Sequence, residues 1–410
     1  MEIITLTLDR IAHGGKAFGK LRAKPVFVAG GLPGEKVRAR VIKQGRVLEA
    51  VLVEVVEASP DRVAARCEPS DIEIADFQHV RYAVQLKLKE AIVRDQFMRM
   101  ARLNDIALRE IRPNPHPWHY RLSTKLSPTR DGGLGYFSRQ VGAVVPAQAC
   151  AVLHPTLQAI VDDIDFDLSD LIKLTVRVGS DGAGQLVFAM RDAEPPQISA
   201  DFPVSVALVM PDGVAATLFG DPFLDEQING HSFRVGAGSY FYPSIAGAEM
   251  VVNSVLELAQ LGKCEQVIDC FSGVGVLTKA LGEISAELIG IEKNPDAIED
   301  ASVNLEESNN IALYNDWAEN ALPAITMQPD LIVLDSDGQP LSNDLGNALL
   351  AKQPPRIIYS SPNLTATTQD ARNFAAAGYK LIHLHALDTL PQTHQIHTVG
   401  LWVRGKGKRK

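Results

Sequence analysis

The first 56 residues alternate apolar and polar positions in short runs. Three of these runs, at residues 3–8, 25–28 and 36–41, have the two-residue period of strands that bury one face. Glycine pairs and Pro33-Gly34 separate the runs, and such residues favour tight turns. Short strands joined at this spacing predict a small closed β-barrel.

The middle of the chain, residues 61–234, mixes helical and strand patterns. A helix is predicted from Tyr82 to about Leu103, and strand-like runs follow at 171–178 and 185–190. The cluster at 118–121, Trp-His-Tyr-Arg, offers aromatic and guanidinium planes that suit stacking on single-stranded RNA. Taken alone, such a cluster is more often a packed domain edge. The pattern predicts a central α+β domain.

From about Gly236 onward, helices alternate with apolar strands, as in a doubly wound parallel sheet. A helix at 248–261 precedes a strand at 266–269, and a tight glycine loop then leads into a helix at 276–281. The remaining strands are predicted at 288–291, 331–334, 357–359, 380–384 and 398–403. The predicted fold class is α/β, with this Rossmann-like domain following the barrel and the central domain.

Composition places the chain among ordinary globular proteins. Of its 410 residues, 46% are hydrophobic and 22% are charged, which is enough to bury a large core in two or three domains. The N-terminus lacks a basic segment followed by an apolar run, and no stretch reaches the roughly 18 apolar residues of a membrane helix. We therefore expect a cytoplasmic protein without membrane contact. The four cysteines are scattered, so buried reduced thiols are expected.

Charge is distributed unevenly along the chain. The formal net charge is -9, yet residues 1–56 carry ten Lys or Arg against five acids, and residues 404–410 carry five more basic residues. Local positive potential is what binding to a polyanion requires. The barrel is therefore either a grip on RNA phosphates or a basic solvated surface, and its charge alone does not separate the two.

The glycine loop suggests a nucleotide-like cofactor. Asp269 ends a strand, Gly273 and Gly275 follow where the backbone must pass close to a ligand, and Glu292 ends the next strand. A carboxylate at that height can accept hydrogen bonds from both ribose hydroxyls of an adenosine. Because the third glycine of a dinucleotide fingerprint is absent, the loop favours S-adenosylmethionine (SAM) over NAD, which stays the alternative.

Ordered motifs over nearly the whole chain resemble the RNA (uracil-5-)-methyltransferase family. The matches are found at residues 28–37 (the TRAM signature), 78–79, 120–121, 150–153, 269–275, 290–292 with Asn304, 377–379, 387–388 and 391–393. The resemblance implies a TRAM/OB-like barrel (1–60) and a central domain (61–234), both binding RNA, then a methyltransferase domain (235–405) and a basic tail (406–410). It also implies SAM as the cofactor and tRNA or rRNA as the partner, and we expect a monomer. The cofactor-binding residues that it implies are Asp269, Phe271, Ser272, Gly273, Gly275, Glu292, Asp335 and Tyr242.

The departures from the family pattern fall on its chemistry. The family adds a cysteine thiolate to uracil C6 and removes the C5 proton with a glutamate. Pro362 occupies the cysteine position and His397 the glutamate position, where histidine can accept a proton but a structural role is favoured. The base-holding motifs have become Asp335-Ser336-Asp337-Gly338 and Tyr242-Pro243-Ser244. No catalytic residue is therefore assigned.

Two hypotheses follow from the sequence. The first is a divergent SAM-dependent enzyme acting on RNA without the family's thiolate. The second is a non-catalytic relative that binds RNA and SAM. An iron–sulfur cluster is not expected, because only Cys67 and Cys150 match the cluster cysteines of many family members and a cluster needs four ligands.

Overall fold

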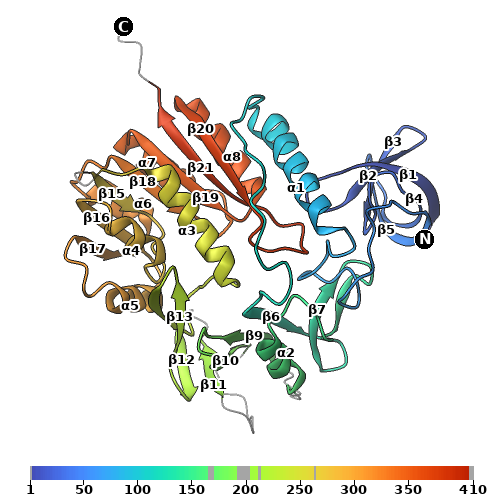
Figure 1. Cartoon of the computed structure of the whole chain (residues 1–410), viewed down its shortest axis with the longest axis horizontal. Coiled ribbons are helices and arrows are strands. Elements are labelled where there is room, and N and C mark those ends of the chain that lie inside the picture. The colour runs from blue at the N-terminus through green and yellow to red at the C-terminus, as the bar shows by residue number, and fades with distance from the viewer. Residues whose placement is uncertain (1, 165–169, 192–203, 211–213, 263–264, 406–410) are drawn as a thin grey trace.

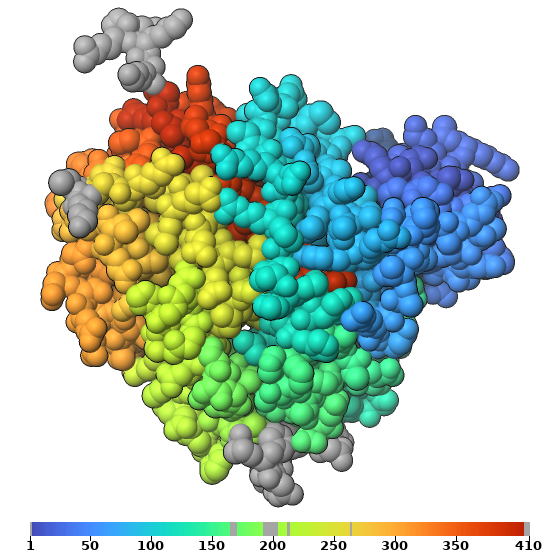
Figure 2. Space-filling model, viewed as in Figure 1, coloured from blue at the N-terminus to red at the C-terminus, as the bar shows by residue number. Residues whose placement is uncertain are grey.

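The computed structural model describes residues 2–164, 170–191, 204–210, 214–262 and 265–405, so the predicted basic tail lies outside the described residues. Three parts surround a shared interior: an N-terminal barrel, a central sheet and a C-terminal α/β unit (Figure 1). In the space-filling view the barrel projects as a lobe of its own (Figure 2). Within the described residues, no helix is long and apolar enough to span a membrane.

The predicted N-terminal barrel is present and closed. Its five strands are arranged in the order β1-β2-β3-β5-β4. Side chains of β1 alternate between exposed and buried, so that Ile4, Leu6 and Leu8 fill the interior. The barrel is consistent with a TRAM/OB-like domain. Its strands are β1(Ile3–Ile11), β2(Ala17–Leu21), β3(Lys24–Ala29), β4(Lys36–Lys43) and β5(Leu48–Glu57).

The long predicted helix is present as α1(Tyr82–Gln96), which continues into one π-helical turn, η1(Phe97–Ala101). It leads to a central seven-stranded sheet in the order β12-β11-β10-β9-β6-β7-β8, with α2(Pro155–Asp162) on its apolar face. The strands of this sheet are β6(Ser123–Pro128), β7(Leu134–Ser138), β8(Ala143–Pro146), β9(Leu171–Val178), β10(Gly184–Met190), β11(Val204–Val209) and β12(Ala215–Phe219).

A two-stranded hairpin, β13(Phe223–Ile228) and β14(His231–Gly236), connects the central sheet to the C-terminal unit. Its buried side chains Ile228, Phe233 and Val235 pack in the same core as α3 and the C-terminal sheet. The methyltransferase-like core therefore begins before residue 235, where the sequence pattern placed the boundary.

The C-terminal unit is the predicted Rossmann-like domain. Its sheet has the order β17-β16-β15-β18-β19-β21-β20, parallel from β17 to β19, while β21 runs antiparallel to both of its neighbours. The strands are β15(Gln266–Asp269), β16(Glu287–Glu292), β17(Ile311–Asn315), β18(Leu331–Asp335), β19(Arg356–Ser361), β20(Tyr379–Leu387) and β21(His397–Arg404). The helices are α3(Ile245–Ala259), α4(Val276–Gly282), α5(Pro295–Asn304), α6(Ala318–Ala324), α7(Asn343–Lys352) and α8(Leu364–Ala376).

A single apolar cluster runs from the barrel through α1 into the C-terminal sheet. The loop between β20 and β21 reaches toward α1 (Figure 1). There the Lys89 ammonium contacts the Asp388 carboxylate at 2.5 Å, and both side chains are 0% exposed. Beside this pair, the Gln85 side chain donates to the Gln392 side chain at 2.7 Å. The three parts are therefore fixed to one another by both apolar and polar contacts.

The expectation of reduced thiols is wrong for two of the four cysteines, because Cys67 and Cys150 form a disulfide. The two lie 83 positions apart in the sequence, but the fold brings their backbones together as an isolated antiparallel bridge. Sequence spacing alone could not reveal that contact. Cys270 is a free, buried cysteine.

Candidate functional site

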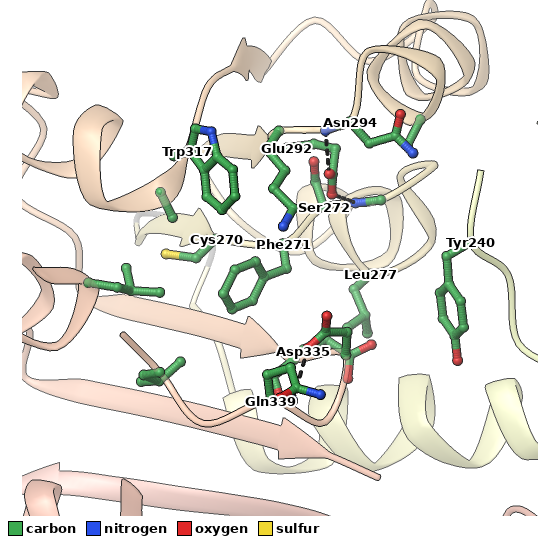
Figure 3. A pocket seen from close by; sticks show the side chains of 18 of the residues that line it. Tyr240, Cys270, Phe271, Ser272, Leu277, Glu292, Asn294, Trp317, Asp335 and Gln339 are labelled. Atoms are coloured by element: carbon green, nitrogen blue, oxygen red, sulfur yellow. Dashed lines mark hydrogen bonds between the residues drawn. The ribbon is translucent and has the colours of Figure 1, made fainter. Parts of the chain in front are cut away.

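A pocket of about 410 Å³ opens at the carboxyl ends of the parallel strands of the C-terminal sheet. This edge is where open α/β sheets bind ligands. In Figure 3, Glu292 and Trp317 lie on one side of the pocket, Asp335 and Gln339 lie opposite, and Phe271 projects between them. Six of the eight predicted cofactor residues line it: Tyr242, Phe271, Ser272, Gly273, Glu292 and Asp335.

The other two predicted residues support the pocket from beneath. Asp269 is fully buried at the end of β15, and its carboxylate accepts a hydrogen bond from the Thr278 hydroxyl at 2.8 Å. Gly275 has a φ of +94°, and a side chain there would press against Leu305. Both residues shape the turn between β15 and α4 without reaching the pocket wall.

Glu292 is held in place by two backbone amides. The amide of Gly273 donates to one of its carboxylate oxygens at 3.0 Å, and the amide of Asn294 donates to the other at 2.8 Å. These bonds join the ends of β15 and β16 and fix the carboxylate at the pocket wall. A carboxylate oxygen can accept more than one hydrogen bond, so capacity remains for a ligand's hydroxyl groups.

A polar group closes the pocket on the side of β18. The Tyr242 hydroxyl donates to Asp335 Oδ2 at 2.5 Å, while His397 Nε2 lies 2.8 Å from Ser360 Oγ and 3.8 Å from Asp335 Oδ1. Burial lowers the pKa of His397, and the nearby Asp335 carboxylate offsets only part of that effect. The imidazole is therefore neutral at physiological pH.

Two buried polar atoms in the pocket wall, Ser272 Oγ and Asp335 Oδ1, have no hydrogen-bond partner among the described residues. Leaving a buried polar atom unpaired costs free energy, so such atoms mark places where a ligand or water completes the site. Burial, with a further contribution from Asp335, raises the pKa of Asp269 to about 7, although the Thr278 hydroxyl opposes the shift. The carboxyl groups of Asp269, Glu292 and Asp335 thus lie close together at the carboxyl edge of the C-terminal sheet.

Among the described residues of the pocket wall, Pro362 stands where the sequence resemblance implied a nucleophile. Ser360 and Ser361 are fully buried and are not part of the pocket wall. Cys270 does line the pocket, but burial and the Asp269 carboxylate raise the pKa of its thiol well above the ordinary value, so the unreactive protonated form persists.

The sequence pattern missed part of the pocket wall. Asn294, Asp316 and Trp317 line it just beyond β16 and β17, and the Lys293 ammonium lies 4.1 Å from the centre of the Trp317 ring. Strand β17 is short, and its apolar run at residues 311–314 was not assigned to a strand in the sequence. Their positions in the sequence could have identified these residues, because residues that directly follow parallel strands lie at the same edge of the sheet as Glu292.

Metal coordination has no support within the described ranges, where no group of three or more His, Cys, Asp or Glu side chains is arranged to hold an ion. The site is therefore described by its acids, its aromatic residues and the glycine loop.

A Rossmann-like domain with its pocket at the carboxyl edge, joined to a central sheet and an N-terminal barrel, is the architecture of the tRNA uracil-C5 methyltransferases. The structure of Pyrococcus abyssi tRNA (uracil-54, C5)-methyltransferase in complex with S-adenosyl-L-homocysteine superimposes with a TM-score of 0.74 and 21% identity, covering 98% of this chain and 100% of that one. The predicted fold is confirmed.

Curated relatives extend the likeness to sequence. An uncharacterized RNA methyltransferase of Thermosynechococcus vestitus is 26% identical over 97% of both chains. Another, of Streptomyces avermitilis, is 27% identical over 98% of both chains, and one of Enterococcus faecalis is 26% identical over 98% of this chain and 97% of its own. No family model matches the sequence. The resemblance to RNA methyltransferases is confirmed, and it extends over nearly the whole of both sequences.

Proposed function

We propose that this protein is a SAM-dependent RNA methyltransferase that transfers its methyl group without a cysteine adduct. The observation that carries the proposal is a pocket with a fixed acid at a strand end and two unpaired buried polar atoms, on the fold of RNA methyltransferases. The solved neighbour from Pyrococcus abyssi binds S-adenosyl-L-homocysteine, which supports the same class of ligand here.

The residues present suit SAM better than a dinucleotide. The pocket wall carries five carboxylates (Glu292, Asp316, Glu319, Asp335 and Asp337) and one ammonium, that of Lys293. An acidic lining attracts the sulfonium cation of SAM and repels a pyrophosphate. Glu292 would hold the ribose, the apolar faces of Phe271, Leu277 and Trp317 would cover the adenine, and Ser272 with Asp335 would bind the polar end. When bound, SAM supplies an electrophilic methyl group.

The acceptor atom is inferred to differ from uracil C5. Attack through C6 needs a thiolate, and the only cysteine in the pocket wall is protonated. An N-methylating site commonly stacks the base on an aromatic residue in this loop, whereas residues 335–338 contain none.

A non-catalytic RNA- and SAM-binding relative is the second candidate. It is favoured by one observation: His397, the residue at the family's base position, is buried, and its Nε2 lies 2.8 Å from Ser360 Oγ, so that this nitrogen is already engaged within the protein. In this role the protein would retain the cofactor as a structural ligand.

Cofactor binding is tested by titration calorimetry with SAM on wild type, Glu292→Ala and Glu307→Ala. Glu307 is an exposed acid outside the pocket, so its substitution matches the charge change. We expect Glu292→Ala to weaken binding at least about tenfold, because hydrogen bonds to a charged group contribute about 1.5–3 kcal/mol each. The Glu307→Ala control should bind as wild type does. An absence of heat from wild type at millimolar SAM would exclude the cofactor.

Methyl transfer is tested with labelled SAM and bulk RNA, followed by identification of the modified nucleoside. Transfer to a position other than uracil C5 would support the enzyme. SAM binding without transfer to any RNA would favour the non-catalytic relative, and transfer to C5 would contradict the inferred acceptor.

A further inference from the structure

The solvent face of the central sheet carries a group of basic side chains. On β6 this face includes Lys125, and on the neighbouring strand β9 it includes Lys173 and Arg177. Figure 1 shows where these two strands lie in the central sheet. The register pairs Ser123 with Arg177 and Lys125 with Thr175, so these side chains point to the same face, while Leu174 and Val176 point into the core.

Opposite charges do not neutralise the two lysines. Both are exposed, and in the part of the chain that the structure describes neither forms an ion pair. Partial burial lowers the pKa of Lys125, and repulsion from Lys173, Arg177 and Arg121 lowers it further. Lys125, Lys173 and Arg121 are therefore close enough to act as one positive surface. Arg177 differs from them, because it is largely buried and lies near the Glu226 and Asp300 carboxylates.

The barrel differs in this respect, although it has more basic residues. Five of its ten cations are paired with carboxylates: Lys16 and Lys43 with Glu49, Lys36 with Glu57, Arg38 with Glu54, and Arg10 with Asp95 of α1. Such pairing reduces the local positive potential that these side chains present to a polyanion.

The basic face leads directly to the pocket. Arg177 donates to the carbonyl oxygen of Gly236 at 3.1 Å and to that of Ser239 at 2.7 Å. The next residue, Tyr240, lines the pocket and is 62% exposed. At the start of β6, the amide of Leu122 donates to the carbonyl oxygen of Pro243, which fixes the sheet against the segment carrying Tyr242.

We infer that the face formed by Lys125, Lys173 and Arg121 binds the phosphates of single-stranded RNA and directs the strand to Tyr240, whose exposed ring stacks on a base at the pocket mouth, while Arg177 anchors the segment before Tyr240 to the sheet. The inference rests on the proposed RNA substrate and specifies where the strand runs. Lysine and arginine hold phosphates without reading sequence, and an exposed aromatic ring stacks on any base. Access to the pocket then depends on a path across the central sheet.

The test measures binding of a labelled mixed-sequence RNA of about 20 nucleotides to the full-length protein without SAM, at several salt concentrations. Each phosphate contact to a single strand contributes about -0.7 to the slope of log affinity against log salt. Lys125→Gln/Lys173→Gln should therefore make the slope shallower by about 1.4. The control, Lys87→Gln/Lys380→Gln, makes the same charge change at exposed lysines of α1 and β20 and should keep the wild-type slope. Lys125→Arg/Lys173→Arg should also keep it.

A slope for the glutamine variant equal to that of wild type would overturn the inference and leave the proposed function standing. An absence of RNA binding by wild type would instead remove the RNA substrate itself. If the glutamine variant fails to fold, cross-linking of 4-thiouridine RNA to wild type decides the question. Cross-linked peptides from 121–127 or 171–177 support the inference, and cross-links confined to residues 3–57 overturn it.

Discussion

The buried ion pair between α1 and the loop after β20 gives a sharp test of how the three parts hold together. Replacing Lys89 with Met keeps the length and apolar stem of the side chain but removes its ammonium group. The Asp388 carboxylate is then left buried with Oδ1 unpaired, and its other oxygen, Oδ2, already lacks a partner among the described residues. Removing one member of a buried ion pair leaves the charge of the other member buried without a partner, which is destabilising.

The expected cost follows from the burial of both partners. Each side chain is 0% exposed, so water cannot replace the lost contact without opening the junction. Breaking such a pair costs about 3–5 kcal/mol of unfolding free energy. The double variant Lys89→Met/Asp388→Leu removes both charges and should recover most of that loss. Arg99→Met, which breaks the exposed Arg99–Asp95 pair, should cost no more than about 1 kcal/mol.

Urea unfolding followed by tryptophan fluorescence measures these four proteins and the single variant Asp388→Leu. The coupling energy of the pair follows from the double-mutant cycle of wild type, Lys89→Met, Asp388→Leu and the double variant. The reasoning fails if Lys89→Met lies within about 1 kcal/mol of wild type, as a solvated pair would. It also fails if the double variant is as unstable as the single one, because the loss would then come from packing and not from a stranded charge.

Three further predictions use other buried groups. Burial raises the pKa of Glu226 to about 7 from an ordinary 4.5, so its contribution to stability is present below pH 4.5 and is lost as pH rises through about 7. In urea unfolding, the free energy of unfolding of Glu226→Gln should rise relative to that of wild type by up to about 3 kcal/mol between pH 5 and pH 8. A difference between the two proteins that does not change with pH would contradict this. Replacing Cys67 and Cys150 by serine should lower stability by up to about 4.6 kcal/mol, since the disulfide closes a long loop, and equal melting temperatures would argue that the bond does not form. Intact-mass analysis after incubation with SAM and 5-fluorouracil RNA should show no covalent adduct for wild type or Pro362→Cys, and a wild-type adduct would indicate that another residue, such as Ser361, attacks C6.

Much of the C-terminal unit was predictable because its strands are buried on both faces. Strand β15 was placed at its observed bounds, and β16 was placed within one residue at each end, so the acids at their ends were located correctly. Strand β17 carries a short apolar run, residues 311–314, which was not assigned to a strand in the sequence, and the structure leaves its residues exposed or partly buried. Asp316 and Trp317, which follow it, were missed for that reason.

Contacts between distant segments were beyond pattern analysis. The Cys67–Cys150 disulfide and the Lys89–Asp388 pair join residues 83 and 299 positions apart. One clue to the first contact was present: both cysteines match positions that hold a single cluster in many family members, and ligands of one cluster lie close together. Lys89 offered no such clue, since a lysine in an amphipathic helix ordinarily points to solvent.

The apolar cluster that unites barrel, α1 and C-terminal sheet has a consequence for the choice among RNAs. Moving one part against another to close the pocket mouth would disrupt this shared apolar cluster. We therefore expect the barrel, α1 and the C-terminal sheet to move as one rigid body. Under the proposed function, an RNA substrate would have to bend, unstack or extrude a nucleotide to reach the pocket, and sequences that deform at low energetic cost would gain an advantage. The choice among RNAs can therefore depend on how stiff each RNA is, including at nucleotides that no side chain contacts.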